Sequence, residues 1–562
     1  FFSSTVADWT SARKDRATAM DSDGEEQAPG FGSIVEIPND GLEEPLLPSN
    51  DDEDGPSTVH PLLSSALVVN LISFGFLSLP WAFSQSGITL SFLTLAIVFV
   101  QAYITAVYVA EACARAETWT RFLSKQDDLE PELGDGGEDE DNNNQDLSAP
   151  RRRRQDGISN GLHDHNILEE ENIEDHFMEE DELPMIANQK FELSDLSRIF
   201  LGSRWTMIFT AATFLDLLGA MWVLAAVFAS ALTDLAPLPH THYGNASHCF
   251  YVLVFACLAL PLSCVPSLVD QIPVQMCFLL CRMLMVFTMI VTVAVAMISK
   301  QNHFDPFDDD SSHVPLFGFT PWYLVLQIAI FSGAFQFAVP GIAETTRDKQ
   351  KVPLVFWYAM TFIFVASTLQ STLLSLHFGP DSMQTSSNLN WSGYHGGTGT
   401  WNDETQTRTG VAWWAHAISK FVVLYPAMDG VGVFSLCAVS QGEMLMGAWF
   451  HEEGHSVKKK DWKTRILFRL LGSVSQLVGA MFVKDLSVIA DYTGIFTILS
   501  YSCCPCLLSV YSRRKLREHN LPVTTAYTTF FSGEGWAWII LAIACIAETF
   551  VMVMTVVSRY IM

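Results

Sequence analysis

Three helix-breaking residues lie at the centre of the first apolar segment of the chain. Ser73, Gly75 and Pro80 fall within the run NLISFGFLSLPWAF, where a membrane-spanning helix would ordinarily be regular. Glycine relaxes a helix and proline removes a backbone donor, so the run predicts an interrupted helix. Inside a bilayer, unwound backbone is tolerated only where it is buried in protein or lines a cavity. The freed N–H groups of one half-helix suit an anion such as a carboxylate, and the freed carbonyls of the other half suit a cation.

A later apolar segment, IFSGAFQFAVP, has an interruption of the same kind. Ser332 and Gly333 lie near its centre and Pro340 follows. By our count of apolar segments, the two interruptions fall in the first and sixth spans. Two broken helices in corresponding positions of two halves are typical of inverted-repeat transporters, which bind substrate at the middle of the membrane. The alternative at each position is a simple kink in a packed helix.

Ionisable side chains within the apolar segments are candidates for ion coupling, because a charge inside a membrane is costly and usually functional. Asp429, Asp216 and Glu548 could carry a proton. We rank Asp429 first, because Pro426 lies just before it and should make the surrounding helix irregular.

Arg282, in the fifth span, stays protonated and cannot itself carry a proton. It could pair with a buried carboxylate or extend toward the inner face of the membrane. A sodium site would instead combine backbone carbonyls near Ser73 with hydroxyls such as that of Ser435. We favour proton coupling, and the sequence leaves sodium coupling open.

The elements that hold these residues are predicted from composition. The chain has 562 residues, 49% of them hydrophobic, and a net charge of −29. Residues 1–60 carry −11 of that charge and residues 121–200 carry −15, so the remainder is nearly neutral and very apolar. This profile is typical of a polytopic membrane protein with an acidic tail and an acidic loop.

Eleven segments have the roughly 20 mostly apolar residues that a membrane-spanning helix needs. They are residues 62–83, 88–113, 205–235, 250–268, 274–298, 322–343, 353–376, 413–440, 466–483, 486–511 and 536–558.

We therefore expect an all-α fold of two inverted repeats of five helices and one peripheral helix. The expected parts are a disordered acidic tail (1–60), a first repeat (61–298) with a disordered acidic loop at about 121–195, an extracytoplasmic loop (299–320), a second repeat (321–517) and the eleventh helix (518–562).

The distribution of lysine and arginine predicts a cytoplasmic N-terminus and an extracytoplasmic C-terminus. With that orientation, 25 of the 32 basic residues lie in cytoplasmic segments. Two glycosylation sequons, at Asn245 and Asn390, fall in loops that the same orientation places outside. We expect glycosylation at both, in the plasma membrane or in a vacuolar or endolysosomal membrane.

Four sequence motifs carry a family resemblance. SFGFLSLPWAF followed by SQSG resembles the first-span signature of the amino acid/auxin permease family. FELSDLSRIFLGSRW, FSGAFQFAVPGIAETTRDKQKVP and YTGIFTILSYSCCPCLL resemble its segment before span three, its sixth span and its tenth span, in that order. The resemblance covers about residues 60–515 without the acidic loop. The chain departs from the pattern at Ser73, where the family usually has glycine, and at Gln336, a position often held by histidine.

Members of that family are secondary transporters of amino acids or related small molecules, driven by H+ or Na+, with a fold similar to that of the bacterial leucine transporter. The resemblance implies alternating-access transport of an amino acid. It also implies that Arg282 occupies the space that a sodium ion takes in sodium-dependent transporters of this fold. By resemblance, the substrate would be bound by Ser73, Phe74, Gly75, Phe331, Ser332, Gly333 and Phe335.

Other classes of protein fit the sequence less well. We find no P-loop, H-E-x-x-H or G-x-S-x-G motif, so we expect no enzyme, resident metal, organic cofactor or nucleic-acid partner. A channel would need a continuous polar ring along a pore. An amino acid sensor that signals to cytoplasmic partners through its acidic tail and loop is the stronger alternative. Loss of signalling but not of uptake on deletion of residues 121–195 would favour the sensor.

Overall fold

The structure is a computed structural model of the chain, and its described residues form twelve ranges. They are residues 59–72, 75–129, 183–186, 191–236, 244–265, 268–300, 303–304, 314–318, 322–402, 407–450, 462–482 and 496–560. All of them belong to the unit that begins at Pro56. Residues 1–58 of the expected acidic tail, most of the expected acidic loop and the pair Ser73 and Phe74 lie outside the described residues.

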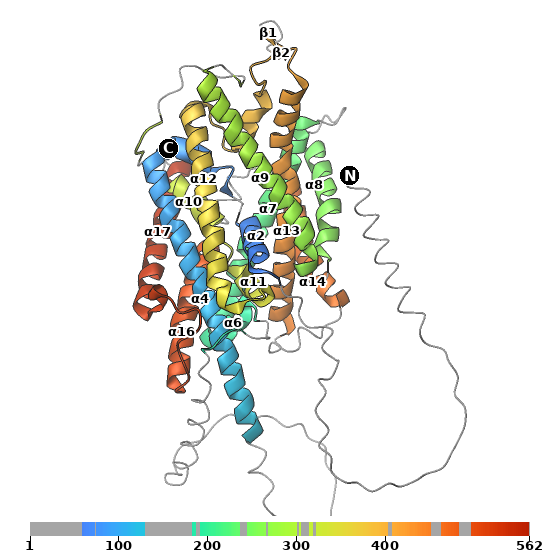
Figure 1. The fold of residues 1–562 in the computed structure, drawn as a ribbon. Helices are drawn as coiled ribbons and strands as arrows, with labels where there is room; N and C mark the ends of the chain where they lie inside the picture. Colours follow the sequence, from blue (N-terminus) through green and yellow to red (C-terminus); the bar gives the residue numbers. More distant parts are fainter. Residues whose placement is uncertain are drawn as a thin grey trace, which may run out of the picture. The chain divides into compact units, whose positions relative to one another are not determined.

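Nine helical segments of the described part are long and apolar enough to cross a membrane, which identifies an integral membrane protein. Figure 1 shows them as a bundle. They are α4 (Ile88–Leu129), α7 (Ser203–Leu235), α8 (Gly244–Ser263), α9 (Leu268–Ser299), α10 with α11 (Trp322–Ser332 and Val339–Thr345), α12 (Val352–Ser382), α13 (Trp413–Phe450), α14 (Trp462–Phe482) and α17 (Glu534–Tyr560).

Two of the eleven expected spans are not among these nine. The first is divided into α2 (Pro61–Leu71) and α3 (Leu79–Ser86), each too short to cross a bilayer alone. The tenth contains a π-helical turn, η8 (Leu499–Cys503), followed by α16 (Cys504–Glu518). Its expected start, residues 486–495, lies outside the described residues, so the count of eleven stays a prediction.

Several helices extend beyond their expected boundaries. α4 continues to Leu129 instead of ending at residue 113, so the expected acidic loop begins with helix. α13 continues ten residues past residue 440, to Phe450. α8 begins at Gly244 rather than at residue 250, which places Asn245 in a helix and not in a loop. Polar or charged residues occur in these extensions, so a search for apolar segments stops too early.

The connections contain short elements that the sequence did not predict. α6 (Leu193–Leu201) starts with a capping box, in which the side chains of Glu192 and Asp195 accept from each other's backbone N–H groups. Between α12 and α13, the strands β1 (Thr400–Asn402) and β2 (Thr407–Thr409) form an antiparallel pair. The 3₁₀ turns are η4 (Gln336–Ala338), η5 (Lys349–Lys351), η6 (Ser387–Gly393) and η9 (Phe530–Ser532).

The described helices pack into three main hydrophobic cores. One contains buried residues of α2, α4, α10, α11, α12 and α16, the second contains buried residues of α7, α8, α13 and α14, and the third contains buried residues of α9, α12, η6 and α13. α13 is the most buried long helix of the described part and packs against α7, α8, α9 and α14. α17 is the most exposed, as expected for a peripheral helix.

Candidate functional site

The interruption of the first helix lies against the end of α10, directly before the second interruption begins. We call residues 72–78 the first break and residues 333–338 the second break. A Cβ atom built on Gly75 would lie 1.7 Å from the Ser332 Oγ atom and 3.0 Å from the Ile328 carbonyl oxygen. Only glycine fits this approach. The structure therefore brings together Gly75 and Ser332, two residues predicted from separate motifs.

Proline positions explain where the helices resume. Pro80 lies in the first turn of α3, and Pro340 lies in the first turn of α11. A missing N–H group costs nothing at these positions, and the fixed φ angle of proline favours helix initiation. Each break is thus followed by a half-helix whose N-terminal end faces the break.

Arg282 of α9 contacts the carbonyl end of α2, just before the first break. Its Nη1 atom donates to the carbonyl oxygens of Val69 at 3.3 Å and Asn70 at 3.2 Å. Its Nε and Nη2 atoms donate to Oδ2 of Asp429, on α13, at 2.8 Å and 2.5 Å. The Arg282 and Asp429 side chains are only 2% and 8% exposed. The guanidinium of a buried ion pair between two other helices therefore binds the carbonyl end of the first half-helix.

A network of neutral side chains surrounds this ion pair. Asn70 donates through Nδ2 to Oε1 of Gln275 at 2.5 Å, and Gln275 donates through Nε2 to Ser435 Oγ at 3.3 Å. The Tyr425 hydroxyl donates to Oδ1 of Asp429 at 3.2 Å. Of these residues, sequence reasoning identified only Ser435. A signal was available, because Gln271, Gln275 and Arg282 lie four and seven residues apart, on one face of a helix.

We expected an irregular backbone around Asp429. The structure describes every residue of α13, and its backbone is regular there. The helix continues through Pro426 without a break, so that prediction was wrong. The charge of Asp429 is compensated instead by the guanidinium of Arg282.

Gln336 closes the second break from within. Its Oε1 atom accepts from the backbone N–H of Phe335 at 2.9 Å, and its Nε2 atom donates to Oγ1 of Thr105 at 3.0 Å. The side chain of Gln336 is fully buried. The ring of Phe335 packs on that of Phe356 in the core, and the ring of Phe331 is half-buried.

Gly333 faces α4 and the π-helical turn. A Cβ atom on Gly333 would lie 3.4 Å from the Ala102 Cβ atom and 3.4 Å from the Tyr501 ring. The Tyr501 hydroxyl donates to the Val98 carbonyl at 2.8 Å, and Gln101 donates to the Ser502 hydroxyl at 2.7 Å. Because π turns occur frequently at functional sites, η8 belongs to the candidate site.

The other candidate proton carriers lie apart from Asp429. Asp216, on α7, accepts from the hydroxyls of Thr497 at 2.6 Å and Ser500 at 2.8 Å. Glu548, on α17, is half-buried and near Cys503. Asp216 and Asp429 are thus placed in separate networks, Asp216 beside the π turn η8 and Asp429 near the first break.

A narrow cavity lies between α2, α11 and α13, beside the breaks. Its volume is about 20 Å³, which is room for about one water molecule. Leu67, Phe337 and Leu436 are among its lining residues. Glu443 also lines it and forms a 3.1 Å ion pair with Arg469 of α14.

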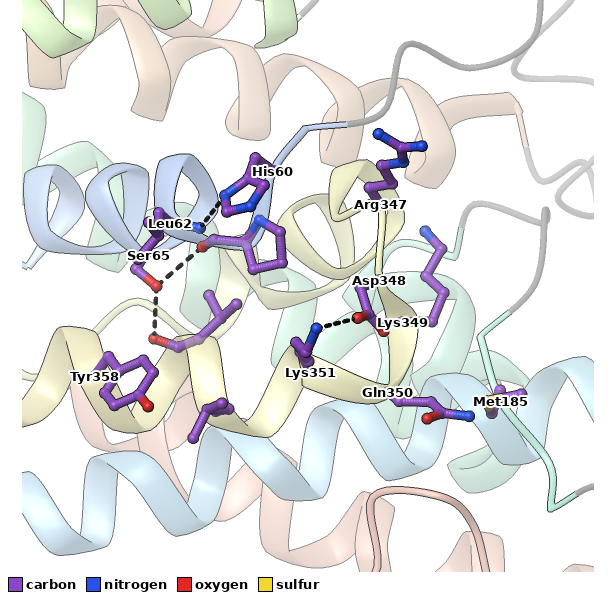
Figure 2. Close-up of a pocket in the computed structure, with 13 residues that line it drawn as sticks. His60, Leu62, Ser65, Met185, Arg347, Asp348, Lys349, Gln350, Lys351 and Tyr358 are labelled. Carbon is purple, nitrogen blue, oxygen red and sulfur yellow. Dashed lines mark hydrogen bonds and ion pairs between the residues drawn. The ribbon is translucent and has the colours of Figure 1, made fainter.

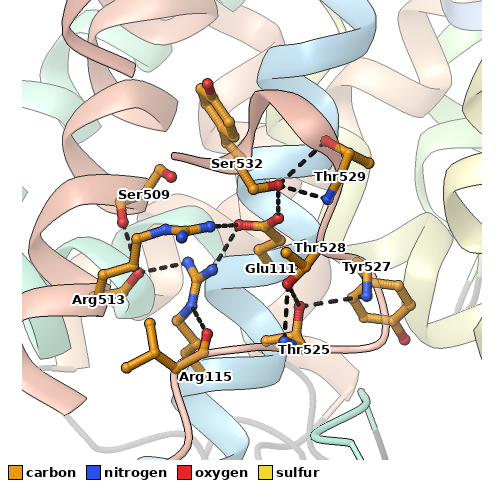
Figure 3. A network of polar contacts seen from close by, with 12 residues as sticks. Glu111, Arg115, Ser509, Arg513, Thr525, Tyr527, Thr528, Thr529 and Ser532 are labelled. Atoms are coloured by element: carbon orange, nitrogen blue, oxygen red, sulfur yellow. Dashed lines mark hydrogen bonds and ion pairs between the residues drawn. The ribbon is translucent and has the colours of Figure 1, made fainter. Parts of the chain in front are cut away.

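Sequence reasoning missed a second buried charged network, which Figure 3 shows. Glu111 of α4 lies between Arg115, at 2.6 Å, and Arg513 of α16, at 2.7 Å. Ser532, in the connection before α17, donates to the other carboxylate oxygen of Glu111. The available signal was Glu111 and Arg115, four residues apart at the end of an apolar run.

The glycosylation predictions are placed as follows. Asn390 lies in η6, where its side-chain amide donates to the Ser382 carbonyl at 2.9 Å and accepts from the Gln384 N–H at 3.1 Å. The Asn245 side chain lies outside the described part.

No protein-family model matches the chain. The chain is 21% identical over 501 residues to the Transmembrane protein 104 homolog of Dictyostelium discoideum, which covers 87% of this chain and 96% of that protein. That name agrees with an integral membrane protein. The amino acid/auxin permease resemblance stays a prediction.

Two solved structures are similar to the chain over most of its length. One is the Eremococcus coleocola manganese transporter in complex with an aromatic bis-isothiourea substituted compound, with a TM-score of 0.48, 11% identity and coverage of 89% of this chain and 90% of that one. The other is a mutant of that transporter, with a TM-score of 0.47, 12% identity and coverage of 87% and 86%.

Proposed function

We propose that this chain is a secondary active transporter that moves amino acids across a membrane by alternating access, coupled to protons. The observation that carries the proposal is the meeting of two broken helices at Gly75 and Ser332. In this reading, the first five spans and the next five are the two repeats that move against each other around the breaks.

The chemistry of the helix ends supports an amino acid as substrate. Each break presents one carbonyl end, at α2 and at α10, and one N–H end, at α3 and at α11. Carbonyl ends attract a cation and N–H ends attract an anion. A zwitterionic amino acid carries both charges. Its binding residues would be Ser73, Phe74, Gly75, Phe331, Ser332, Gly333 and Phe335.

The position of Arg282 supports protons rather than sodium as the coupling ion. Its guanidinium supplies a fixed positive charge to the carbonyls of Val69 and Asn70. Asp429 is the acidic partner whose protonation would weaken its ion pair with Arg282, because a neutral carboxyl binds a guanidinium less strongly than a carboxylate does. Proton binding at Asp429 would thereby free Arg282, together with the end of the first half-helix that it binds, to move away from α13.

Uptake by proteoliposomes tests this proposal. The purified chain would be reconstituted and supplied with a radiolabelled amino acid mixture under an imposed pH gradient or a sodium gradient, beside the Gly333→Val variant. We expect uptake driven by the pH gradient and lost in the variant, whose side chain would meet Ala102 and Tyr501.

The other outcomes each change the proposal. Uptake that requires sodium would overturn the role of Arg282 and retain a transporter. No uptake of any amino acid by folded protein would overturn the amino acid as substrate and favour either the sensor alternative or a transporter of a different substrate class.

A further inference from the structure

A cavity of about 660 Å³ lies apart from the two breaks, where α2 begins and where α11 is followed by α12. Its walls come from residues 60–65, from residues 347–358 and from Met185. Figure 2 shows the side chains that line it. We call it the basic cavity, and none of the residues discussed above as transport site lines it.

Three basic side chains gather on one side of the basic cavity. Arg347, Lys349 and Lys351 lie within five residues, and Asp348 is the one carboxylate among the residues that line the cavity with them. Lys349 is held in place, because its Nζ atom donates to the carbonyls of Ala343, at 3.0 Å, and Glu344. Arg347 forms no ion pair with any residue of the described part. The cavity therefore has a net positive charge and suits an anion.

The remaining ion pair of the cavity is weak. Lys351 and Asp348 are 2.6 Å apart, but their side chains are 57% and 38% exposed. Exposed pairs of this kind contribute little to stability, so Lys351 can exchange its partner for a ligand at small cost. Two helix starts add to the positive potential, because α2 begins at Pro61 and α12 at Val352 beside the cavity.

The edge of the cavity is apolar and exposed. Leu62, Leu354 and Tyr358 line the cavity and are 67%, 41% and 53% exposed. On helices that cross a membrane, exposed apolar side chains contact acyl chains. A charged interior beside such an edge matches an amphiphile with an anionic headgroup.

We propose that the basic cavity binds a phosphate-bearing anion, and that its source is the headgroup of a phosphorylated phospholipid. Because three basic residues and one carboxylate line the cavity, it suits a ligand with more than one negative charge, such as a phosphoinositide headgroup. The cavity lies at the end of the helices that the lysine and arginine distribution places on the cytoplasmic side. Basic pockets on that side of a membrane bind the headgroups of anionic lipids.

A ligand in this cavity would bridge α2 and α12. The start of α2 is already tied to the end of α11, because Val59 donates to the Thr345 carbonyl at 2.7 Å and the Arg347 N–H donates to the Val59 carbonyl at 2.8 Å. Thr346 also donates to the Ser64 hydroxyl at 3.0 Å. The bound headgroup would therefore hold the first half-helix in its present position.

Binding to the full chain in detergent tests the site by titration calorimetry. The probes would be dioctanoyl phosphatidylinositol 4,5-bisphosphate, soluble inositol 1,4,5-trisphosphate and dioctanoyl phosphatidylcholine. We expect binding of the bisphosphate lipid and none of phosphatidylcholine. The double variant Arg347→Gln/Lys351→Gln should weaken lipid binding about 10- to 30-fold.

A matched control removes two exposed charges elsewhere. Arg514→Gln/Arg517→Gln changes the net charge equally, and both arginines pair only with Glu534 in the described part. We expect this control to bind the lipid as the wild type does. Leu62→Asn should weaken binding of the lipid and leave any binding of the trisphosphate unchanged, since it alters only the apolar edge.

Three results would overturn parts of the proposal. Unchanged lipid binding by the Arg347/Lys351 variant, or an equal loss in the control, would overturn the site. Failure of both phosphorylated probes to bind would do the same. Trisphosphate binding as tight as that of the lipid would retain the phosphate site and overturn the lipid as its source. Thermal unfolding without ligand shows that each variant is folded.

Discussion

The two breaks are closed by different chemistry. The carbonyl end before the first break is held by an ion pair, Arg282 with Asp429, supplied by α9 and α13. The second break is held by a neutral amide of its own, that of Gln336, which reaches Thr105 of α4. One closure depends on charge and on distant segments, and the other depends on local hydrogen bonds.

This difference indicates which break is suited to switching. A carboxylate can take up a proton, and its ion pair is then weakened. A side-chain amide does not ionise near physiological pH, so its hydrogen bonds do not respond to protons. In the proposed transporter, the first break would therefore respond to the coupling proton, while the second break would serve as a fixed partner. Four substitutions test this comparison.

The largest effect should follow Asp429→Asn. This change leaves the guanidinium of Arg282 buried without a negative partner, and breaking one side of a buried pair costs about 3–5 kcal/mol. We expect a large fall in the thermal unfolding temperature and loss of uptake driven by a pH gradient. Arg282→Met/Asp429→Leu should recover part of the stability and none of the uptake. An unaltered pH-driven uptake in Asp429→Asn would contradict the assignment of the first break as the proton-responsive one.

Gly75→Ala should have the next largest effect. The new Cβ atom would overlap the Ser332 Oγ atom, and overpacking of this kind costs about 1–3 kcal/mol. Gly535→Ala is the matched control, because a Cβ atom there meets nothing within 4 Å. Adding Ser332→Gly to Gly75→Ala should restore part of the stability, because it removes the Ser332 side chain but leaves the Ile328 carbonyl 3.0 Å from the new Cβ atom. If Gly75→Ala were as stable and active as Gly535→Ala, the close contact of the breaks would not exist.

Gln336→Leu should destabilise the protein less than Asp429→Asn does. It leaves the buried N–H of Phe335 without its acceptor, at a cost of about 1–2 kcal/mol. We expect uptake at reduced rate with an unchanged pH dependence, measured over a range of external pH. A shifted pH dependence would show that both breaks take part in proton coupling.

The smallest effect should follow Thr105→Val. It removes the hydroxyl that accepts from Gln336, a neutral hydrogen bond worth about 1 kcal/mol. We expect a small fall in unfolding temperature and nearly normal uptake. A fall in unfolding temperature as large as that of Gln336→Leu would mean that the Gln336 side chain stabilises the break through Thr105 and not through the N–H of Phe335.

The positions of the breaks could be predicted from sequence, because glycine and serine near the centre of an apolar run, with proline a few residues later, together favour an interrupted helix. What closes the breaks could not, since Arg282 lies 213 residues from Val69 and nothing local connects them. The π turn at Leu499–Cys503 has no composition of its own to reveal it. Pro426 misled in the opposite direction, because α13 stays helical through it and is the most buried long helix of the described part. Long-range packing decided each of these cases.

The length of α4 determines where the acidic segment leaves the membrane. Its 42 residues make a helix of about 63 Å, against a bilayer of about 40–45 Å with its headgroups. In Figure 1 its last turns extend past the neighbouring helices. A helix along the membrane normal would thus end roughly 20 Å clear of the lipid surface, beyond the Debye length of about 8 Å. The negative charges that follow residue 129 would then begin too far from the membrane for an anionic leaflet to repel them. A soluble partner could also reach them there without displacing lipid.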